Sequence, residues 1–387
     1  MQLKPLLDKI VLSPEDIDNH FKPVAKDTGK ETYILGTFNP GMAKLKNGNI
    51  LLIVRVAEAL KKTVENGYVL SPRFDVTKKK FVIDKYPKNK VSSNDPRHFD
   101  IIQENGTIAK RLTSISWLLP VEIDSESFEV KKIHYNKVIL PEFDYQEYGV
   151  EDPRIIQLNN KYYMNIVCVG SNKICTALYE SSDGLNYKSK GVIFDHQNKD
   201  VVIIPKKING KYIALTRPEG ATLLAYPNES KNITGKFISA ASSSDLLHWK
   251  PNDNVVLSLK RDSQMDYKLG TGAPPVLIKV NGKEYWLEVF HGVQYQKNNP
   301  VGIYRAFIAL LDKNDPTKFV KIIKKPFIEY NPELKKHING KPFLDKNVVF
   351  VTGIIDSGDN FVLGAGELDT AVRIVVFSKD SVLKFIK

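Results

Sequence analysis

A turn that leads into a short apolar strand recurs five times, and this repeat restricts the fold more than any other feature. Asn-Gly pairs favour type I′ hairpin turns, in which both central residues need a positive φ. After each turn comes a run rich in β-branched and aromatic residues, which is typical of a strand. The five turns span residues 46–49, 159–161, 209–211, 281–283 and 358–360, and the strands begin at residues 50, 162, 212, 285 and 361.

Five copies of one hairpin unit, with almost no helical periodicity, predict an all-β protein folded as a five-bladed β-propeller. A β-sandwich with long loops is the alternative, but sandwiches do not repeat one unit five times. Because no linker, low-complexity tract or run of like charge divides the chain, we expect a single domain over residues 1–387. The N-terminal extension, residues 1–30, would pack either on its own propeller or across a neighbouring subunit, which leaves a homo-oligomer open.

Composition excludes several classes of protein. The net charge is +12, but the lysines are scattered over turns and form no basic motif, so we expect no nucleic-acid partner; the charge suits an enzyme that handles anions. No segment is apolar for 18 residues, which predicts no membrane span. Two cysteines alone, Cys168 and Cys175, indicate reduced thiols and a cytoplasmic protein. Since no Cys/His cluster occurs, we predict no metal.

The phrase Glu151-Asp152-Pro153-Arg154 is the strongest candidate for catalytic chemistry. Proline fixes the backbone on the approach to the next apolar run. Arg154 can hold one carboxylate by a bidentate bond and leave the other free to act on a substrate. A buried Asp-Arg pair that only pins a turn explains the phrase equally well.

Other polar residues stand at the ends of apolar runs, where the strands of a propeller converge on its central channel. Asn39 and Arg55 suit sugar hydroxyls, and Lys268 adjoins a Gly-rich stretch, 270–272, that lets backbone approach a ligand. His291, next to a glycine, is more often structural than catalytic. Three further candidates are Lys199, Asp200 and Arg217.

In their order along the chain, these phrases resemble glycoside hydrolase family 130, the mannoside phosphorylases and β-1,2-mannosidases. The resemblance runs from about residue 10 to about residue 375. The matching phrases include FNPG (38–41), LLIVRVAE (51–58), YGVEDPRI (148–155), NKDVVIIPKKINGKY (198–212), GTGAPP (270–275), FHGV (290–293) and GAGELDT (364–370). One departure is Trp117, which follows the serines of LTSIS (112–116) and would alter the aglycone side.

The resemblance implies phosphorolysis of β-mannosyl disaccharides or oligosaccharides to mannose 1-phosphate, with inversion. Asp152 would be the general acid and would protonate the glycosidic oxygen through a hydroxyl of the mannosyl residue. Inorganic phosphate would be the co-substrate, with no other cofactor. The residues expected to bind substrate are Asn39, Arg55, Arg154, Asp200 and Asp369. The residues expected to bind phosphate are Lys199, Arg217, Lys268, His291 and Tyr304.

Two other functions stay open. An inverting exo-β-1,2-mannosidase would use water and need a base. Glu219 and Glu367 are the candidates for that base, and Glu288 is a weaker one. A non-catalytic propeller that serves as a binding scaffold is the remaining reading, since fold does not settle function.

Overall fold

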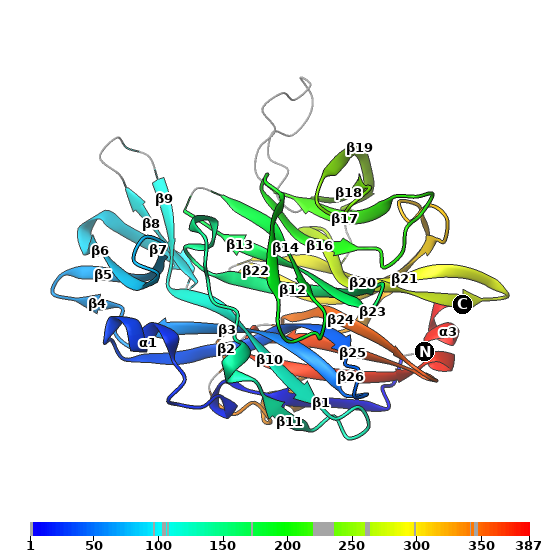
Figure 1. Ribbon diagram of the computed structural model, residues 1–387, viewed down its shortest axis with the longest axis horizontal. Helices are drawn as coiled ribbons and strands as arrows, with labels where there is room; N and C mark the ends of the chain where they lie inside the picture. Colours follow the sequence, from blue (N-terminus) through cyan, green and yellow to red (C-terminus); the bar gives the residue numbers. More distant parts are fainter. Residues whose placement is uncertain are drawn as a thin grey trace.

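The chain is an all-β protein (Figure 1). The computed structural model describes residues 3–95, 97–102, 106, 108–171, 173–219, 236–259, 264–297, 299–340, 342–343 and 347–387. Within these ranges no helix has the length and apolar character needed to cross a membrane. The helices are short: α1 (Pro23–Thr28), α2 (Pro332–Lys335) and α3 (Lys379–Ile386).

Most strands belong to five four-stranded antiparallel sheets. The first contains β2 (Thr32–Lys44), β3 (Ile50–Leu60), β10 (Ser114–Ile123) and β11 (Val130–Ile133). The second contains β12 (Val150–Leu158), β13 (Lys161–Val169), β14 (Ile174–Ser181) and β15 (Lys188–Phe194). The third contains β16 (Asn198–Ile203), β17 (Tyr212–Pro218), β18 (Phe237–Ser243) and β19 (Trp249–Ser258). The fourth contains β20 (Lys268–Val280), β21 (Lys283–Gln296), β22 (Asn299–Asp312) and β23 (Phe319–Ile328). The fifth contains β24 (Val349–Ser357), β25 (Asn360–Glu367), β26 (Ala371–Ser378) and β1 (Leu7–Leu12).

The five predicted hairpin turns join the first strand of each sheet to its second. Three of them have positive φ at both central residues, as a type I′ turn requires: Asn159-Asn160, Asn209-Gly210 and Asn281-Gly282. The other two have positive φ at Gly48 and Gly358. The predicted strands and their turns are therefore confirmed, and each hairpin is the start of one sheet.

In space, the first strand of each sheet contacts the first strand of the next sheet. β2 contacts β12, β12 contacts β16, β16 contacts β20, β20 contacts β24, and β24 contacts β2 again. The N-terminal strand β1 pairs with β26, so the two ends of the chain meet in the fifth sheet. This arrangement turns the first strands of all five sheets toward a common centre.

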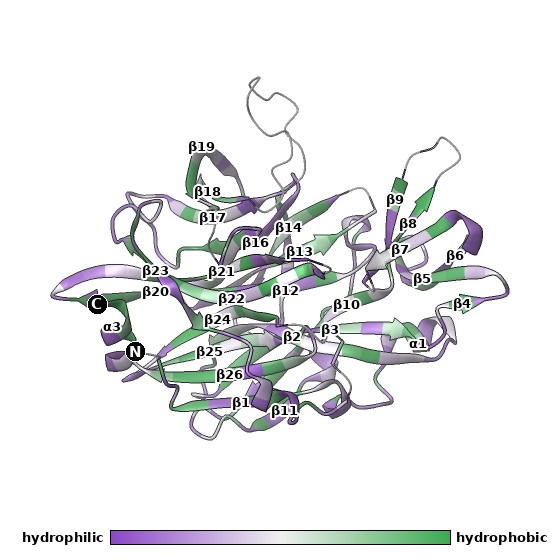
Figure 2. Cartoon of the chain, turned by 180° about the vertical axis from the view of Figure 1, so that it is seen from behind, coloured by the Kyte–Doolittle hydropathy of each residue, from purple (hydrophilic) through white to green (hydrophobic). Residues whose placement is uncertain are grey.

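The core consists of apolar residues packed within and between neighbouring sheets. Along β25 and β26 nearly every residue is buried, and Figure 2 shows hydrophobic residues concentrated there. Helix α3 covers the fifth sheet with Val382 and Ile386, and Ser378 caps it by accepting a hydrogen bond from the Ser381 N–H at 3.2 Å. Cys168 and Cys175 are buried free thiols on opposite residues of β13 and β14.

Two smaller sheets lie outside the five. Both belong to the connection between β3 and β10, which are paired neighbours in the first sheet. One contains β4 (Val64–Glu65), β5 (Tyr68–Asp75) and β6 (Lys80–Pro87), and the other contains β7 (Val91–Asp95), β8 (His98–Ile102) and β9 (Ile108–Leu112). Both lie at one side of the molecule in Figure 1.

Candidate active site

A polar cavity of about 120 Å³ opens where the first strands converge. Its lining comes from all five sheets, the fourth contributing through β22, and from the β7–β8 turn. The lining residues are Asn39, Arg55, Arg97, Asp152, Lys199, Asp200, Arg217, Val301, Tyr304, Val348, Phe350 and Asp369. A larger cavity, about 730 Å³, lies beside the N-terminal segment and α3, and none of the predicted site residues lines it.

The same backbone irregularity aims three of these side chains inward. The φ values are 50° at Asn39, 48° at Asp152 and 54° at Asp200. Each residue lies at a β-bulge, where the pairing register with the next strand shifts. A bulge re-aims a side chain, and a left-handed non-glycine residue costs about 1–3 kcal/mol. Three such residues on the first strands of three sheets indicate a functional centre.

Asp152 lies in a network of hydrogen bonds and ion pairs. Its Oδ1 accepts from Asn39 Nδ2 at 2.8 Å and from Arg55 NH1 at 3.1 Å. Arg55 also donates to Glu151 Oε1 at 2.7 Å and to Ser116 Oγ at 3.0 Å, which fixes the guanidinium. Burial opposes ionisation of Asp152, but the charges of Arg55 and Arg154 outweigh it and lower its pKa.

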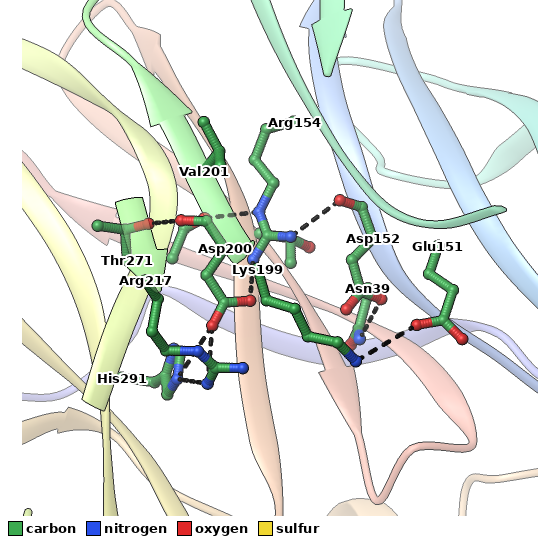
Figure 3. A network of polar contacts seen from close by, with 12 residues as sticks. Asn39, Glu151, Asp152, Arg154, Lys199, Asp200, Val201, Arg217, Thr271 and His291 are labelled. Carbon is green, nitrogen blue, oxygen red and sulfur yellow. Dashed lines mark hydrogen bonds and ion pairs between the residues drawn. The ribbon is translucent and has the colours of Figure 1, made fainter. Parts of the chain in front are cut away.

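Arg154 links the backbone of Asp152 to the side chain of Asp200. It is 1% exposed and donates to the Asp152 carbonyl at 2.8 Å, to the Gly272 carbonyl at 3.1 Å and to Asp200 Oδ1 at 3.3 Å (Figure 3). It holds Asp152 through the main chain and not through the carboxylate. Because it does not line the cavity, its geometry is that of a support for the site.

Several cations lie in or beside the cavity. Arg217 NH1 lies 2.9 Å from Asp200 Oδ2, and Lys199 Nζ lies 3.8 Å from Glu151 Oε2. Burial and the nearby charge of Arg217 lower the pKa of Lys268 and hold that of His291 well below its usual range. A neutral His291 then accepts from Arg217 NH1 at 3.3 Å through Nε2.

Tyr304 and Asp369 complete the lining. The Tyr304 ring stacks on His291 with centroids 5.7 Å apart, and burial raises the pKa of its hydroxyl to about 12. Asp369 lies in a tight turn in which both Leu368 and Asp369 have positive φ, 56° and 48°. Neither residue is glycine, so the turn is strained, and it delivers Asp369 to the cavity.

The three carboxylates considered as bases have different surroundings. Glu219 accepts from Arg217 NH2 at 2.6 Å, beside the cavity. Glu367 is fully buried and bonds to Arg373 NH1 at 2.9 Å and to the Asn331 N–H at 3.2 Å, away from the lining residues. Glu288 is fully buried within β21, and burial raises its pKa well above the usual range.

Comparison with known proteins gives the family. Residues 116–387 match a glycoside hydrolase 130 family model described as β-1,4-mannooligosaccharide phosphorylase. The chain belongs to glycoside hydrolase family 130. It is 31% identical over 345 residues to a β-1,2-mannobiose phosphorylase of Listeria innocua, with 88% of each chain covered. A β-1,2-mannobiose phosphorylase of a Thermoanaerobacter species is 33% identical over 250 residues, covering 63% of this chain and 72% of that one.

Solved structures agree with this family assignment. The Listeria innocua β-1,2-mannobiose phosphorylase in complex with β-1,2-mannobiose superimposes with a TM-score of 0.78 at 28% identity, over 97% of this chain and 96% of that chain. A glycosyl hydrolase from Bacteroides ovatus has a TM-score of 0.65 at 20% identity, over 96% and 91% of the two chains. The second likeness concerns the fold alone.

Most residues that the family resemblance marked come together in space. Eight of them line the cavity: Asn39, Arg55, Asp152, Lys199, Asp200, Arg217, Tyr304 and Asp369. Arg154 and His291 contact lining residues from behind. Trp117 is buried in the core and donates to Glu58 Oε2 at 3.3 Å. Among the described residues, no group of His, Cys, Asp and Glu is arranged to hold a metal ion.

Sequence reasoning missed Arg97, Phe350, Val301 and Val348, which also line the cavity. The guanidinium of Arg154 lies over the Phe350 ring, with its Cζ 5.4 Å from the ring centroid. A signal for Arg97 was present, because Asp95-Pro96-Arg97 repeats the tripeptide Asp152-Pro153-Arg154.

Proposed function

We propose that this member of glycoside hydrolase family 130 is an inverting phosphorylase that cleaves β-1,2-mannosides and releases mannose 1-phosphate. The observation that carries the proposal is the cavity in which Asp152, at a left-handed bulge, shares the lining with the cations Lys199 and Arg217. An acid beside an oxyanion site is what phosphorolysis needs, because phosphate is already a nucleophilic anion. The β-1,2 linkage follows the names of the two relatives described above.

In the proposed reaction Asp152 gives its proton to a hydroxyl of the mannosyl residue, and that hydroxyl passes its own proton to the glycosidic oxygen. The bond from the anomeric carbon to that oxygen breaks, and a phosphate oxygen bonds to the anomeric carbon on the opposite face. The products are mannose 1-phosphate, inverted at the anomeric carbon, and the shortened sugar. Asn39, Arg55 and Asp369 would bind the mannosyl residue, and Lys199, Arg217, Lys268 and Tyr304 the phosphate.

Phosphate also prepares the acid in this scheme. The charges of Arg55, Arg154 and Lys199 keep Asp152 ionised in the free protein. A bound phosphate places negative charge next to Lys199 and offsets part of that field, so it raises the pKa of Asp152. The acid is therefore protonated most readily when the second substrate is present.

Hydrolysis is the second candidate, and the contact of Glu219 with Arg217 is the observation in its favour. A base that activates water must reach the substrate. Glu219 adjoins the cavity through Arg217, whereas Glu367 is tied to Arg373 outside the lining, so Glu219 is the stronger of the two candidates.

For the fold, we propose a single five-bladed β-propeller over residues 1–387. Five four-stranded sheets, whose first strands contact one another in turn, support this proposal. The pairing of β1 with β26 supports it too, because it makes the fifth sheet from both ends of the chain.

The test is sugar release from β-1,2-mannobiose and β-1,4-mannobiose, with and without inorganic phosphate. We expect mannose 1-phosphate from the β-1,2 substrate only when phosphate is present. The Asp152→Asn protein serves as the inactive control. Free mannose at equal rates with and without phosphate would contradict phosphorolysis and favour the hydrolase, and a preference for the β-1,4 substrate would contradict the linkage.

A further inference from the structure

The guanidinium of Arg55 is held by contacts at each of its nitrogens. Its Nε donates to Ser116 Oγ at 3.0 Å, while NH1 donates to Asp152 Oδ1 at 3.1 Å and NH2 to Glu151 Oε1 at 2.7 Å. The ring of Phe38 packs against the same group, with Arg55 Cζ 4.8 Å from the ring centroid. Because the guanidinium is planar and rigid, a bond at Nε also sets the direction of the two other nitrogens.

Ser116 is a buried residue next to the cavity and is not part of its lining. It is 2% exposed and lies on β10, where it is the register partner of Ala57 on β3. Its hydroxyl reaches diagonally across this strand pair to Arg55, two residues before Ala57. Ser116 therefore contacts a side chain that lines the cavity, which is the geometry of a positioning residue.

Gly149 fixes the position of Ser116. The two residues form a parallel bridge between β10 and the segment that leads into β12. The φ of Gly149 is 112°, which disfavours any residue with a side chain, and a Cβ added there would lie 2.6 Å from the Ser116 nitrogen. The Gly149 carbonyl also accepts from the Val169 N–H on β13 at 3.1 Å. This close approach of two backbones sets the distance between Ser116 and the strand that carries Asp152.

The direction of Arg55 matters for the ionisation of the acid. Burial raises the pKa of Asp152, and the charges of three cations bring it below its ordinary value. These cations are, in order of strength, Arg55, Arg154 and Lys199. The Asp369 carboxylate interacts with the same group, because the charge of Asp152 adds to the effect of burial and raises the pKa of Asp369. If Arg55 turned away, the strongest of the three attractions would weaken and the pKa of Asp152 would rise.

We propose that Ser116 is a positioning residue for the general acid: held by Gly149, its hydroxyl fixes the Arg55 guanidinium, which orients Asp152. The proposal rests on the proposed function, in which Asp152 is the acid. Ser116 would touch neither the sugar nor phosphate. Loss of its hydroxyl would leave the Asp152 carboxylate in place but less firmly oriented, so that fewer encounters with the substrate would have the geometry for proton transfer.

The experiment compares Ser116→Ala with the unchanged protein and with the matched control Ser114→Ala. Both variants remove one hydroxyl from β10, but Ser114 is the register partner of Ala59, whereas Ser116 is the serine that bonds to Arg55. The first measurement is kcat/KM for β-1,2-mannobiose as a function of pH, at one phosphate concentration. The second is kcat of Asp152→Asn with and without Ser116→Ala. A Tm close to that of the unchanged protein shows that each variant is folded.

The pH profile is the readout that a purely structural role would not move. We expect Ser116→Ala to lower the maximum of kcat/KM roughly 3- to 10-fold and to move the alkaline limb to higher pH by up to about one pH unit. That limb reports the ionisation of the acid, and a weakened contact with Arg55 raises the pKa of Asp152. Because the titration of phosphate affects every variant alike, only the difference from the unchanged protein counts. Ser114→Ala should follow the profile of the unchanged protein.

The double variant shows whether Ser116 acts through the acid. Once Asp152 is replaced by asparagine, no proton is left to orient. We therefore expect Ser116→Ala to change the remaining kcat of Asp152→Asn by less than about twofold, since substitutions within one network are not additive.

Two results would overturn the role of Ser116. One is a pH profile of Ser116→Ala that coincides with that of Ser114→Ala, and the other is an equal loss of kcat in both backgrounds, which would assign Ser116 to the structure of β10 alone. The proposed function fails in a different way. In that case Asp152→Asn itself keeps more than a tenth of the original kcat, or the unchanged protein turns over β-1,2-mannobiose at the same rate without phosphate.

Discussion

Two clusters in this protein bury carboxylates around an arginine, and they are built differently. In the cavity, Arg55 holds Glu151 and Asp152. In the fifth sheet, Arg373 holds Asp8 through two bonds of 2.7 and 2.8 Å and Glu367 through one of 2.9 Å. A second donor bond from Arg373 NH1 reaches the Glu329 carbonyl at 2.8 Å.

The two clusters differ in their backbone conformation. Asp152 lies at a left-handed bulge, whereas Glu367 and Arg373 lie on β25 and β26, which pair without interruption. The cavity cluster has a strained backbone and lines the polar cavity. The Arg373 cluster has a regular backbone, joins β1 to β26 and lies at the edge of the larger cavity. The same residue types thus form the proposed catalytic site in one place and join strands in the other.

The largest effect should come from the acid of the cavity. Asp152→Asn keeps the shape and the hydrogen bonds of the side chain but removes its proton-donating function. We expect kcat for phosphorolysis of β-1,2-mannobiose to fall by about 10²–10⁴-fold, which is the usual contribution of a general acid. The Tm should stay close to that of the unchanged protein. A variant with more than a tenth of the original kcat would show that Asp152 is not the acid.

The opposite pattern should appear in the fifth sheet. Arg373→Met leaves Glu367 and Asp8 without their cation, and breaking such a buried pair costs about 3–5 kcal/mol of unfolding free energy. Urea unfolding measures this loss, and kcat per folded molecule should be retained. Lys161→Met is the control, because its ion pair with Glu180 is on the surface and is worth less than about 1 kcal/mol. A loss of kcat without a loss of stability would place Arg373 in the catalytic machinery.

The contrast also marks the limit of what the sequence could predict. The five hairpins could be predicted because Asn-Gly turns and runs of β-branched and aromatic residues are local signals, and the ends of these runs pointed to Asn39, Asp152 and Asp200. Asp369 was expected to bind substrate, and Glu367, two residues before it, was a candidate base. Only the left-handed turn at Leu368 and Asp369 separates them, since it turns Asp369 into the cavity and leaves Glu367 on the strand beside Arg373.

Arg154 and Arg97 show two other limits. The sequence suggested that Arg154 grips a carboxylate of its own phrase, but the bulge at Asp152 presents the backbone carbonyl to it, and the carboxylate it reaches is that of Asp200. Arg97 belongs to a long insertion that follows no repeat, so its approach to the cavity depends on tertiary packing. The tripeptide Asp95-Pro96-Arg97 repeats that of Asp152, but it does not show that this turn packs against the cavity.

A smaller, pH-dependent effect should distinguish the Arg373 cluster from the cavity. Burial raises the pKa of Glu367 from 4.5 to about 7. The folded protein then keeps a proton that the unfolded chain releases, so stability falls as pH rises from about 4.5 to 7. In Glu367→Gln this decline should be reduced, by up to about 3 kcal/mol across the window. Urea unfolding at several pH values measures it, and parallel curves for the two proteins would contradict the buried neutral acid.

The smallest effect should come from Glu219, and it decides whether the cavity needs a base. Its carboxylate accepts a hydrogen bond from Arg217, and a glutamine oxygen can accept the same hydrogen bond. Phosphate needs no base, so Glu219→Gln should change kcat of phosphorolysis by less than about threefold. A tenfold change would correspond to ~1.4 kcal/mol of activation free energy.

Product analysis with and without phosphate makes this last measurement decisive. If Glu219 were the base for water, the variant would lose phosphate-independent release of mannose by 10²-fold or more, as is usual for a lost general base. The cavity would then be the site of a hydrolase with two catalytic carboxylates, Asp152 and Glu219, and Arg217 would orient Glu219. A small change in kcat, together with strict dependence on phosphate, leaves Asp152 as the one carboxylate that transfers a proton and assigns Arg217 to the anion.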